Sequence, residues 1–301
     1  MTEAEAGGRR GRRIGGNDRV DQQPGFVLHS YPWRETSLII EAFTRDHGRM
    51  ALVARGAKRP TSQLRGLLDP FCPLALSWSG RNEIKSLVRV EWLGGLAPLR
   101  GDGLLAAFYL NELLVRLMIR ADAHEHLFAA YIGALRALAQ DGADQQSILR
   151  GFELDLLRQI GYLPPLDHAA EGEPIEPARW YHVDSQRGWV ATEAPDTLSV
   201  QGTTLRAMAA RDFRRGQAAA QSKSLLRQLI RYHLNGQPLN TRRILQDLRA
   251  LETVDPASSI RPCLLLQGHD CAQRQSQQGR PGAQHARARH PERHAAGADC
   301  A

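Results

Sequence analysis

The chain has 301 residues, of which 42% are hydrophobic, and this length suits one large or two ordinary globular domains. Lys and Arg number 39 against 32 Asp and Glu, and the formal net charge of +7 favours a polyanionic partner, either nucleic acid or an acidic protein segment. The sequence has no run of about 18 apolar residues that would cross a membrane, and its N-terminus lacks the apolar stretch of a secretory signal.

Both ends of the chain are predicted to be disordered. Residues 1–23 are polar and glycine-rich, and residues 254–301 are rich in Gln, Arg, His, Ala and Gly without an apolar period. The second segment fits either a natural extension or a frameshifted end. Three of the four cysteines lie in it, and only Cys72 lies in a regularly patterned segment, so we expect no disulfide framework and a reducing, cytoplasmic compartment.

Residues 24–98 show the pattern of short strands. The apolar and β-branched runs are Phe26–His29, Leu38–Thr44, Arg49–Arg55, Leu74–Trp78 and Ile84–Trp92. Gly48 supplies the positive φ of a tight turn between the second and third runs, and residues 79–82 form a turn between the last two. Five short strands without a long helix predict a small barrel of the OB-fold type.

Alternation along two of these strands predicts which side chains share a face. In the third run, Met50, Leu52 and Ala54 point one way, and Arg49, Val53 and Arg55 point the other way. In the last run, Lys85 and Arg89 are expected opposite an apolar face that consists of Ile84, Val88, Val90 and Trp92.

After Pro98 the apolar spacing becomes helical, and residues 99–253 are predicted to form a mainly helical domain. The expected helices are 104–120, 127–138, 148–160, 222–234 and 241–251. Gly161 is placed to end the third helix. The segment 164–194 is loop-like, with short strands at 180–183 and 188–191. The predicted fold class is therefore α+β, with an N-terminal OB-fold β-barrel followed by a helical domain that carries a small β insertion.

The segment after the third strand carries four basic side chains, which are Arg55, Lys58, Arg59 and Arg65. A basic loop beside a barrel face suits sequence-independent binding of a single strand, because cations follow the phosphates while apolar or aromatic faces accept bases. The alternative is an ordinary solvated loop. Trp33 is the best candidate for base stacking, although tryptophans in a small barrel more often pack than stack.

Motifs for catalysis and metal binding are absent from the sequence. It contains no GxxxxGK[ST] loop, no GxGxxG before a helix, no HExxH and no GxSxG, and its histidines lack ligand spacing. Glu41, Glu83 and Glu91 in the barrel segment are interpreted as surface charge. We therefore expect a protein that is not an enzyme and that uses no metal and no other cofactor.

Five motifs, in their order along the chain, carry a resemblance to a known family. They are Phe26-Val27-Leu28-His29-Ser30-Tyr31-Pro32-Trp33-Arg34-Glu35-Thr36-Ser37-Leu38, Gly48 with the strand into Ala54-Arg55-Gly56-Ala57, Leu68-Asp69-Pro70-Phe71, Tyr109-Leu110-Asn111-Glu112-Leu113, and Phe152-Glu153-Leu154-Asp155-Leu156-Leu157 leading to Gly161-Tyr162. With this order and spacing, the stretch from about residue 26 to residue 251 resembles the RecO family of bacterial recombination mediators.

The resemblance implies an OB-fold and a helical C-terminal domain that bind single- and double-stranded DNA. RecO proteins anneal complementary strands, bind the acidic C-terminal tail of the single-strand binding protein SSB, and with RecR help RecA to replace SSB. Some members hold zinc through four cysteines after the glycine-tyrosine motif. This chain has no cysteine between Cys72 and Cys263, so zinc is not implied.

The expected function is that of a recombination mediator in DNA repair, acting in the cytoplasm at the nucleoid. The alternative is a helical adaptor that binds SSB and RecR and contacts DNA only incidentally, and an enzyme is a third class. Neutralising the basic loop separates the first two, because DNA binding and annealing collapse in the first case and survive in the second.

Two sets of site residues are expected. The DNA surface combines basic residues of two strand faces and one loop, which are Arg49, Arg55, Lys58, Arg59, Arg65, Lys85 and Arg89. The SSB tail needs an apolar groove rimmed by cations, and this site is expected at Phe128, Tyr131, Arg116, Arg120 and Arg150, with Leu127 and Leu135. The alternatives are that these apolar residues are core and that Arg116 pairs with Glu112; the stripe Lys223, Arg227 and Arg231 is then the next candidate.

Overall fold

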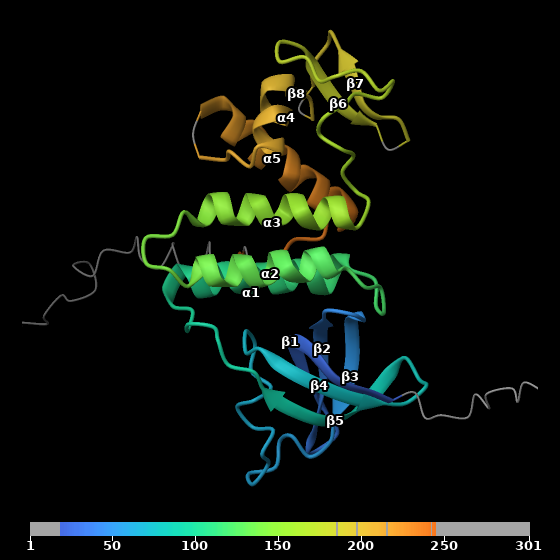
Figure 1. The fold of residues 1–301 in the computed structure, drawn as a ribbon, viewed down its shortest axis with the longest axis vertical. Coiled ribbons are helices and arrows are strands. Elements are labelled where there is room, and N and C mark those ends of the chain that lie inside the picture. The colour runs from blue at the N-terminus through green and yellow to red at the C-terminus, as the bar shows by residue number, and fades with distance from the viewer. Residues whose placement is uncertain (1–18, 185, 197, 215, 242, 245–301) are drawn as a thin grey trace, which may run out of the picture. The chain divides into compact units, whose positions relative to one another are not determined.

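The computed structural model describes residues 19–184, 186–196, 198–214, 216–241 and 243–244. Its elements follow the order β1–β5, α1–α3, β6–β8, α4 and α5 (Figure 1). Residues 1–18 of the predicted leader, the predicted tail 254–301 and most of the helix predicted at 241–251 lie outside the described residues. Because β1 begins at Arg19, the last part of the predicted leader belongs to a strand.

The five N-terminal strands form a closed barrel in the order β1-β2-β3-β5-β4. Their bounds are β1 Arg19–Trp33, β2 Ser37–Thr44, β3 Gly48–Ala54, β4 Leu74–Ser79 and β5 Ile84–Trp92. β3 and β5 run parallel, and the other neighbouring pairs are antiparallel. β1 pairs with β2 along its second part and with β4 along its first part, and Gly25 belongs to both pairings. The predicted OB-fold barrel is confirmed.

The turn between β2 and β3 requires a glycine at position 48, as predicted. Its φ is +63°, in the left-handed region that side chains disfavour. A methyl group at Gly48 would lie only 1.7 Å from the carbonyl oxygen of Asp122. The loop that follows the first helix therefore packs directly on this barrel turn.

β5 corrects the predicted apolar face. Of the residues assigned to that face, Ile84, Val88 and Trp92 are exposed. The residues of β5 that pack against the barrel core are Leu87 and Val90. The predicted alternation along this strand is therefore wrong.

A β-bulge at Val88 explains the change of phase. Trp78 of β4 lies opposite Leu87, whereas its neighbour Ser77 lies opposite Arg89, so Val88 is an extra residue on β5. Since successive side chains of a strand alternate between faces, one inserted residue reverses the alternation beyond it. Nothing in the local sequence predicts this slip, because it depends on the pairing with β4.

The C-terminal part is mainly helical, as predicted. Its helices are α1 Gly101–Leu117, α2 Glu125–Leu138, α3 Gln145–Gln159, α4 Gly202–Ala209 and α5 Gly216–His233. The strands β6 Trp180–Asp184, β7 Gly188–Thr192 and β8 Val200–Gln201 form a small sheet in the order β7-β6-β8. Asp144 caps α3 by accepting a hydrogen bond from the Ser147 amide, and Gly161 with φ +77° follows its end. Of the helices in the described ranges, none combines the length and apolar content that a membrane crossing requires.

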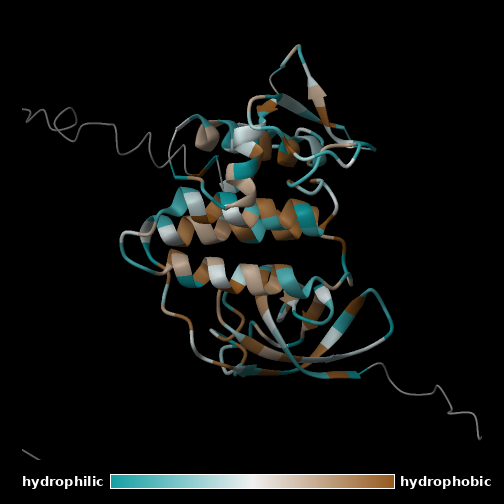
Figure 2. Ribbon diagram, turned by 45° about the horizontal axis from the view of Figure 1, so that its top comes forward, coloured by the Kyte–Doolittle hydropathy of each residue, from teal (hydrophilic) through white to brown (hydrophobic). Residues whose placement is uncertain are grey.

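One hydrophobic core joins the barrel to the helices. Phe26 and Leu28 of β1 and Phe43 of β2 pack in the same cluster as α2 residues Phe128 and Tyr131. Val27, between Phe26 and Leu28, instead points into the separate core of the barrel. β1 therefore supplies side chains to two cores. Figure 2 shows hydrophobic residues concentrated in the helices and barrel strands, with hydrophilic residues in many connecting loops.

Candidate nucleic-acid interface

The loop between β3 and β4 is built from successive turns. The amide of Arg59 donates to the Gly56 carbonyl at 3.1 Å, that of Ser62 to the Arg59 carbonyl at 3.0 Å, and that of Arg65 to the Ser62 carbonyl at 3.2 Å. Ala57 and Leu68 are buried in the barrel core and anchor the two ends of this stretch. The loop is therefore held on the barrel by its apolar residues, while its basic residues remain outside.

Four predicted DNA-binding residues lie together on this loop. Arg55, Lys58, Arg59 and Arg65 are all exposed. Within the described part of the chain, their side chains make no ion pair and no hydrogen bond. We call Arg55, Lys58, Arg59 and Arg65 the basic loop. Cations that are not neutralised by neighbouring carboxylates are available to bind phosphate groups.

The other three predicted DNA-binding residues are placed differently. Arg49 is mostly buried and pairs with Glu41 at 2.9 Å. Lys85 donates to the carbonyls of Gly80 and Asn82, whereas Arg89 is exposed and pairs with Glu91. Because of the bulge at Val88, Lys85 and Arg89 do not share the polar face that was predicted for them. The structure therefore brings together four of the seven predicted residues.

Glu41 is the centre of a junction between the barrel and the helices. Its carboxylate, 2% exposed, accepts hydrogen bonds from Arg49 and from Arg120, which follows α1. Arg49 also donates to the Met118 carbonyl at 2.9 and 3.1 Å. The hydrogen bond to Glu41 is the main cause that raises the pKa of Arg120 above its ordinary value. Glu41 is thus a buried structural acid, and its interpretation as surface charge is corrected.

The apolar half of the predicted SSB-tail groove lies in the core. Phe128 is 4% exposed and Tyr131 is 0% exposed, and Leu127 and Leu135 are buried with them. The Tyr131 hydroxyl donates to Asn111, whose amide group donates in turn to the Leu28 carbonyl at 3.0 Å. These side chains fix β1 to α1 and α2 and offer no groove lining, so the predicted groove does not match their placement.

The basic half of that predicted groove is occupied by intramolecular contacts. Arg116 pairs with Glu112 at 3.4 Å and donates to the Pro238 carbonyl at 2.7 Å. Arg120 pairs with Glu41 and Glu83, and Arg150 pairs with the fully buried Glu153. Replacing Arg120 or Arg150 by an acid would therefore set two carboxylates against each other in the interior, in addition to changing the surface.

Glu153 lies at the centre of a buried polar group between α1 and α3. The Tyr109 hydroxyl donates to its Oε1 at 2.6 Å, and Arg150 donates to the same oxygen. Burial raises the pKa of Glu153 above its ordinary value, and Arg150 only partly opposes this effect. Lys223 and Arg227 of α5 also act electrostatically on Glu153. Cations of α3 and α5 are therefore gathered on one side of the helical domain.

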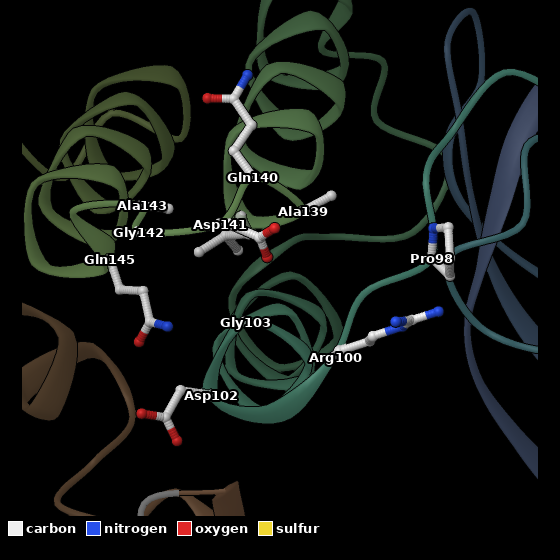
Figure 3. Close-up of a pocket in the computed structure, with 11 residues that line it drawn as sticks. Pro98, Arg100, Asp102, Gly103, Ala139, Gln140, Asp141, Gly142, Ala143 and Gln145 are labelled. Atoms are coloured by element: carbon white, nitrogen blue, oxygen red, sulfur yellow. The ribbon is translucent and has the colours of Figure 1, made fainter.

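A small hollow lies at the N-terminal end of α1, with a volume of about 230 Å³ (Figure 3). Its lining includes Arg100, which precedes α1, Asp102 of α1, and Asp141 of the loop between α2 and α3. Two carboxylates beside one guanidinium make it a poor site for a polyanion. Among the residues that the structure describes, no group of three or more His, Cys, Asp or Glu side chains is arranged to hold a metal ion.

Comparison with known proteins gives matches over both parts of the chain. A family model described as Recombination protein O N terminal matches residues 20–96, and one described as Recombination protein O C terminal matches residues 99–243. The DNA repair protein RecO of Ralstonia nicotianae is 53% identical over 236 residues, which cover 77% of this chain and 86% of the relative. The protein of the same name from Aromatoleum aromaticum is 51% identical over 236 residues, which cover 77% of this chain and 98% of the relative.

Proposed function

Because the chain belongs to the recombination protein O family, whose relatives are named as DNA repair proteins, we propose that it is a recombination mediator that binds DNA through its barrel. In this role it binds single- and double-stranded DNA, anneals complementary strands and, with RecR, helps RecA to load on SSB-coated single strands. It acts at the nucleoid in the cytoplasm. The observation that carries this proposal is the basic loop, with four exposed cations on the barrel that no carboxylate of the described residues neutralises.

The proposed mechanism requires no catalytic residue. Two complementary strands repel each other through their phosphates, and base pairing supplies the free energy once they meet. A surface that neutralises phosphates and releases counterions lowers this repulsion without reading sequence. The basic loop has the required chemistry, because its cations extend from a backbone that is anchored by Ala57 and Leu68.

The test removes two cations of the basic loop. Lys58→Ala/Arg59→Ala should weaken binding to single strands and lower the slope of log affinity against log salt by about 1.4, which corresponds to two phosphate contacts. A control variant of equal charge is Arg179→Ala/Arg187→Ala, since both arginines are exposed and pair with exposed glutamates around the small sheet. An unchanged slope, with annealing of SSB-coated strands intact, would favour the adaptor that contacts DNA only incidentally.

For the acidic SSB tail, we propose the cationic side of α3 and α5 in place of the buried groove. Lys223, Arg227 and Arg231 recur every four residues on α5, and Lys223 and Arg227 lie close enough to Glu153 to act on its pKa. Lys223→Glu should weaken binding of an SSB-tail peptide in fluorescence anisotropy and leave annealing of bare strands unchanged. Lys223 suits this test because, among the residues that the structure describes, the hydrogen bond of its amino group is to the Gln146 side chain at 3.2 Å and not to a carboxylate. Unchanged peptide affinity would exclude this surface.

A further inference from the structure

The strand register shows which side chains lie on the outer face of the barrel. Ile40 of β2 lies in the barrel core, and Ser30 of β1 is opposite it. The next pair along the ladder, Tyr31 and Ile39, therefore points outward. Ile39 is in turn opposite Val53 of β3. Tyr31, Ile39 and Val53 thus form one row across three strands on the outer face.

Among the residues that the structure describes, the helices cover one end of this outer face. At the covered end, Phe43 lies in the core that is shared with α2, and Glu41 and Arg49 form the junction with the residues after α1. At the other end, Ile39 and Val53 are half-buried and belong to neither hydrophobic core. An apolar floor is therefore left open between the strands.

Two aromatic rings stand on this open end. Tyr31 is 42% exposed and Trp33 is 44% exposed, and both lie at the C-terminal end of strand β1. The ring of Tyr31 packs edge-to-face with His29, with centroids 4.5 Å apart, which restrains its orientation. The guanidinium of Arg34 lies 5.9 Å from the Trp33 ring. Large aromatic surfaces thus remain free in a restrained position, next to a cation.

The basic loop lies beside these rings. The amide of Lys58 donates to the carbonyl of Thr36 at 2.9 Å, so the loop is fastened to the turn that follows Trp33. Leu38 and Ala54, at the base of the two segments, are opposite each other in the sheet. Residues that are far apart in the sequence therefore form one surface of cations and rings. Of the nearby acids, Glu35 is exposed on the turn, whereas Glu41 is neutralised by two arginines.

We propose that Tyr31 and Trp33 form a platform that stacks unpaired nucleobases and thereby makes this protein bind single strands more tightly than duplex. The inference rests on the proposed DNA-binding function and goes beyond it. Bases in a duplex stack on each other and present only their edges, so exposed rings gain a partner only when the strand is unpaired. The cations of the basic loop act on both forms of DNA, because both carry phosphates.

The chemistry of the surface favours a nucleic acid strand over a protein segment as its occupant. Arg34 lies 5.9 Å from the Trp33 ring, and the basic loop is fastened to the turn after Trp33 through the Lys58 amide, so rings and cations are neighbours as flat bases and charged backbone are in a single strand. Stacking on ring faces leaves the pairing edges of the bases free. A strand held in this way remains able to meet its complement, as annealing requires.

The test compares two double variants that differ only in whether ring faces remain. Tyr31→Leu/Trp33→Leu keeps apolar side chains but removes the rings, and it should lower the affinity for a single-stranded oligonucleotide roughly ten-fold or more. The affinity of this variant for duplex should stay within about two-fold of that of the parent protein. The slope of its log affinity against log salt should be unchanged, since no phosphate contact is lost. Tyr31→Phe/Trp33→Phe keeps ring faces and should retain most of the affinity.

Several outcomes would overturn the platform and leave the proposed function intact. In the first, Tyr31→Leu/Trp33→Leu keeps its single-strand affinity while Lys58→Ala/Arg59→Ala binds more weakly. In the second, Tyr31→Leu/Trp33→Leu loses affinity for single strand and duplex to the same extent. If Lys58→Ala/Arg59→Ala binds normally, the proposed function itself fails.

A measurement on the unaltered protein is photocross-linking to a bromodeoxyuridine oligonucleotide, which should label the peptide that contains Tyr31 and Trp33. Labelling confined to other peptides would refute the platform.

Discussion

Replacing Glu41 by alanine removes the carboxylate that Arg49 and Arg120 share between the barrel and the helices. The carboxylate is 2% exposed, and Arg49 is 14% exposed at its side chain. Breaking a buried ion pair by removing one partner leaves an uncompensated charge in a poorly solvated place. We therefore expect Glu41→Ala to destabilise the fold, and to do so at the interface between its two parts.

The structure sets the size of the effect near the lower end of the range of about 3–5 kcal/mol for such a loss. Arg120 keeps Glu83 as a partner and is 34% exposed, so its charge remains solvated. Arg49 loses its only ion-pair partner in the described part of the chain but keeps two hydrogen bonds to the Met118 carbonyl. A loss of about 3 kcal/mol would lower the Tm by about 6–12 °C for a fold of this size.

Thermal and urea unfolding followed by circular dichroism measure this loss. The matched control is Glu83→Ala, because Glu83 binds the same guanidinium of Arg120 but is 73% exposed. An exposed pair contributes at most about 1 kcal/mol, so the control should shift the Tm by only a few degrees. If Glu41→Ala is no more destabilising than Glu83→Ala, burial does not govern this junction and the reasoning is refuted.

Three further predictions follow from other features. Burial raises the pKa of Glu153 in the folded state, so the stability of the unaltered protein declines as the pH rises through that pKa. Glu153→Gln lacks this titration, so its unfolding free energy relative to the unaltered protein should increase from acidic to neutral pH. A difference that is constant with pH would contradict this. Gly48→Ala places a methyl group 1.7 Å from the Asp122 oxygen and should destabilise by about 2–4 kcal/mol in urea unfolding, whereas Gly133→Ala, with open space in α2, should be neutral or better. Chelation by EDTA should leave the Tm unchanged, and about one zinc per chain in elemental analysis of untagged protein would disprove this.

The elements that depend on local signals could be predicted from the sequence. The hairpin at Gly48 rests on a positive φ that glycine tolerates, and the helices α1 to α3 follow their apolar spacing. The OB-type barrel could be expected from five short strands and from the family resemblance, and the closed five-stranded barrel agrees with it. The basic loop was also identified correctly as a cluster of exposed cations, because its charges are close in sequence.

Features that depend on distant partners could not be predicted in the same way. The bulge at Val88 is set by the pairing of β5 with β4, and it separated Lys85 from Arg89. Glu41 lies in a strand of mostly buried residues, which is a signal that the carboxylate needs a cation, but no local pattern indicates Arg49 and Arg120 as its partners. The apolar stripe of α2 that includes Phe128 would show the same spacing of apolar residues whether it packed in the core or lined a binding groove. Only the packed structure shows that it lies in the core.

The division of β1 between two cores affects how the protein is made on the ribosome. The strands that carry Phe26, Leu28 and Phe43 are synthesised before the α2 residues that cover them. The barrel is complete only once Trp92 at the end of β5 has been made, and at about 5–20 residues per second the interval from there to Tyr131 lasts roughly 2–8 seconds, during which an apolar patch on the nascent barrel has no cover. The same patch would be exposed on a barrel expressed as a separate fragment. A nascent-chain holdase, or rapid translation of this stretch, would protect the full-length protein during that interval.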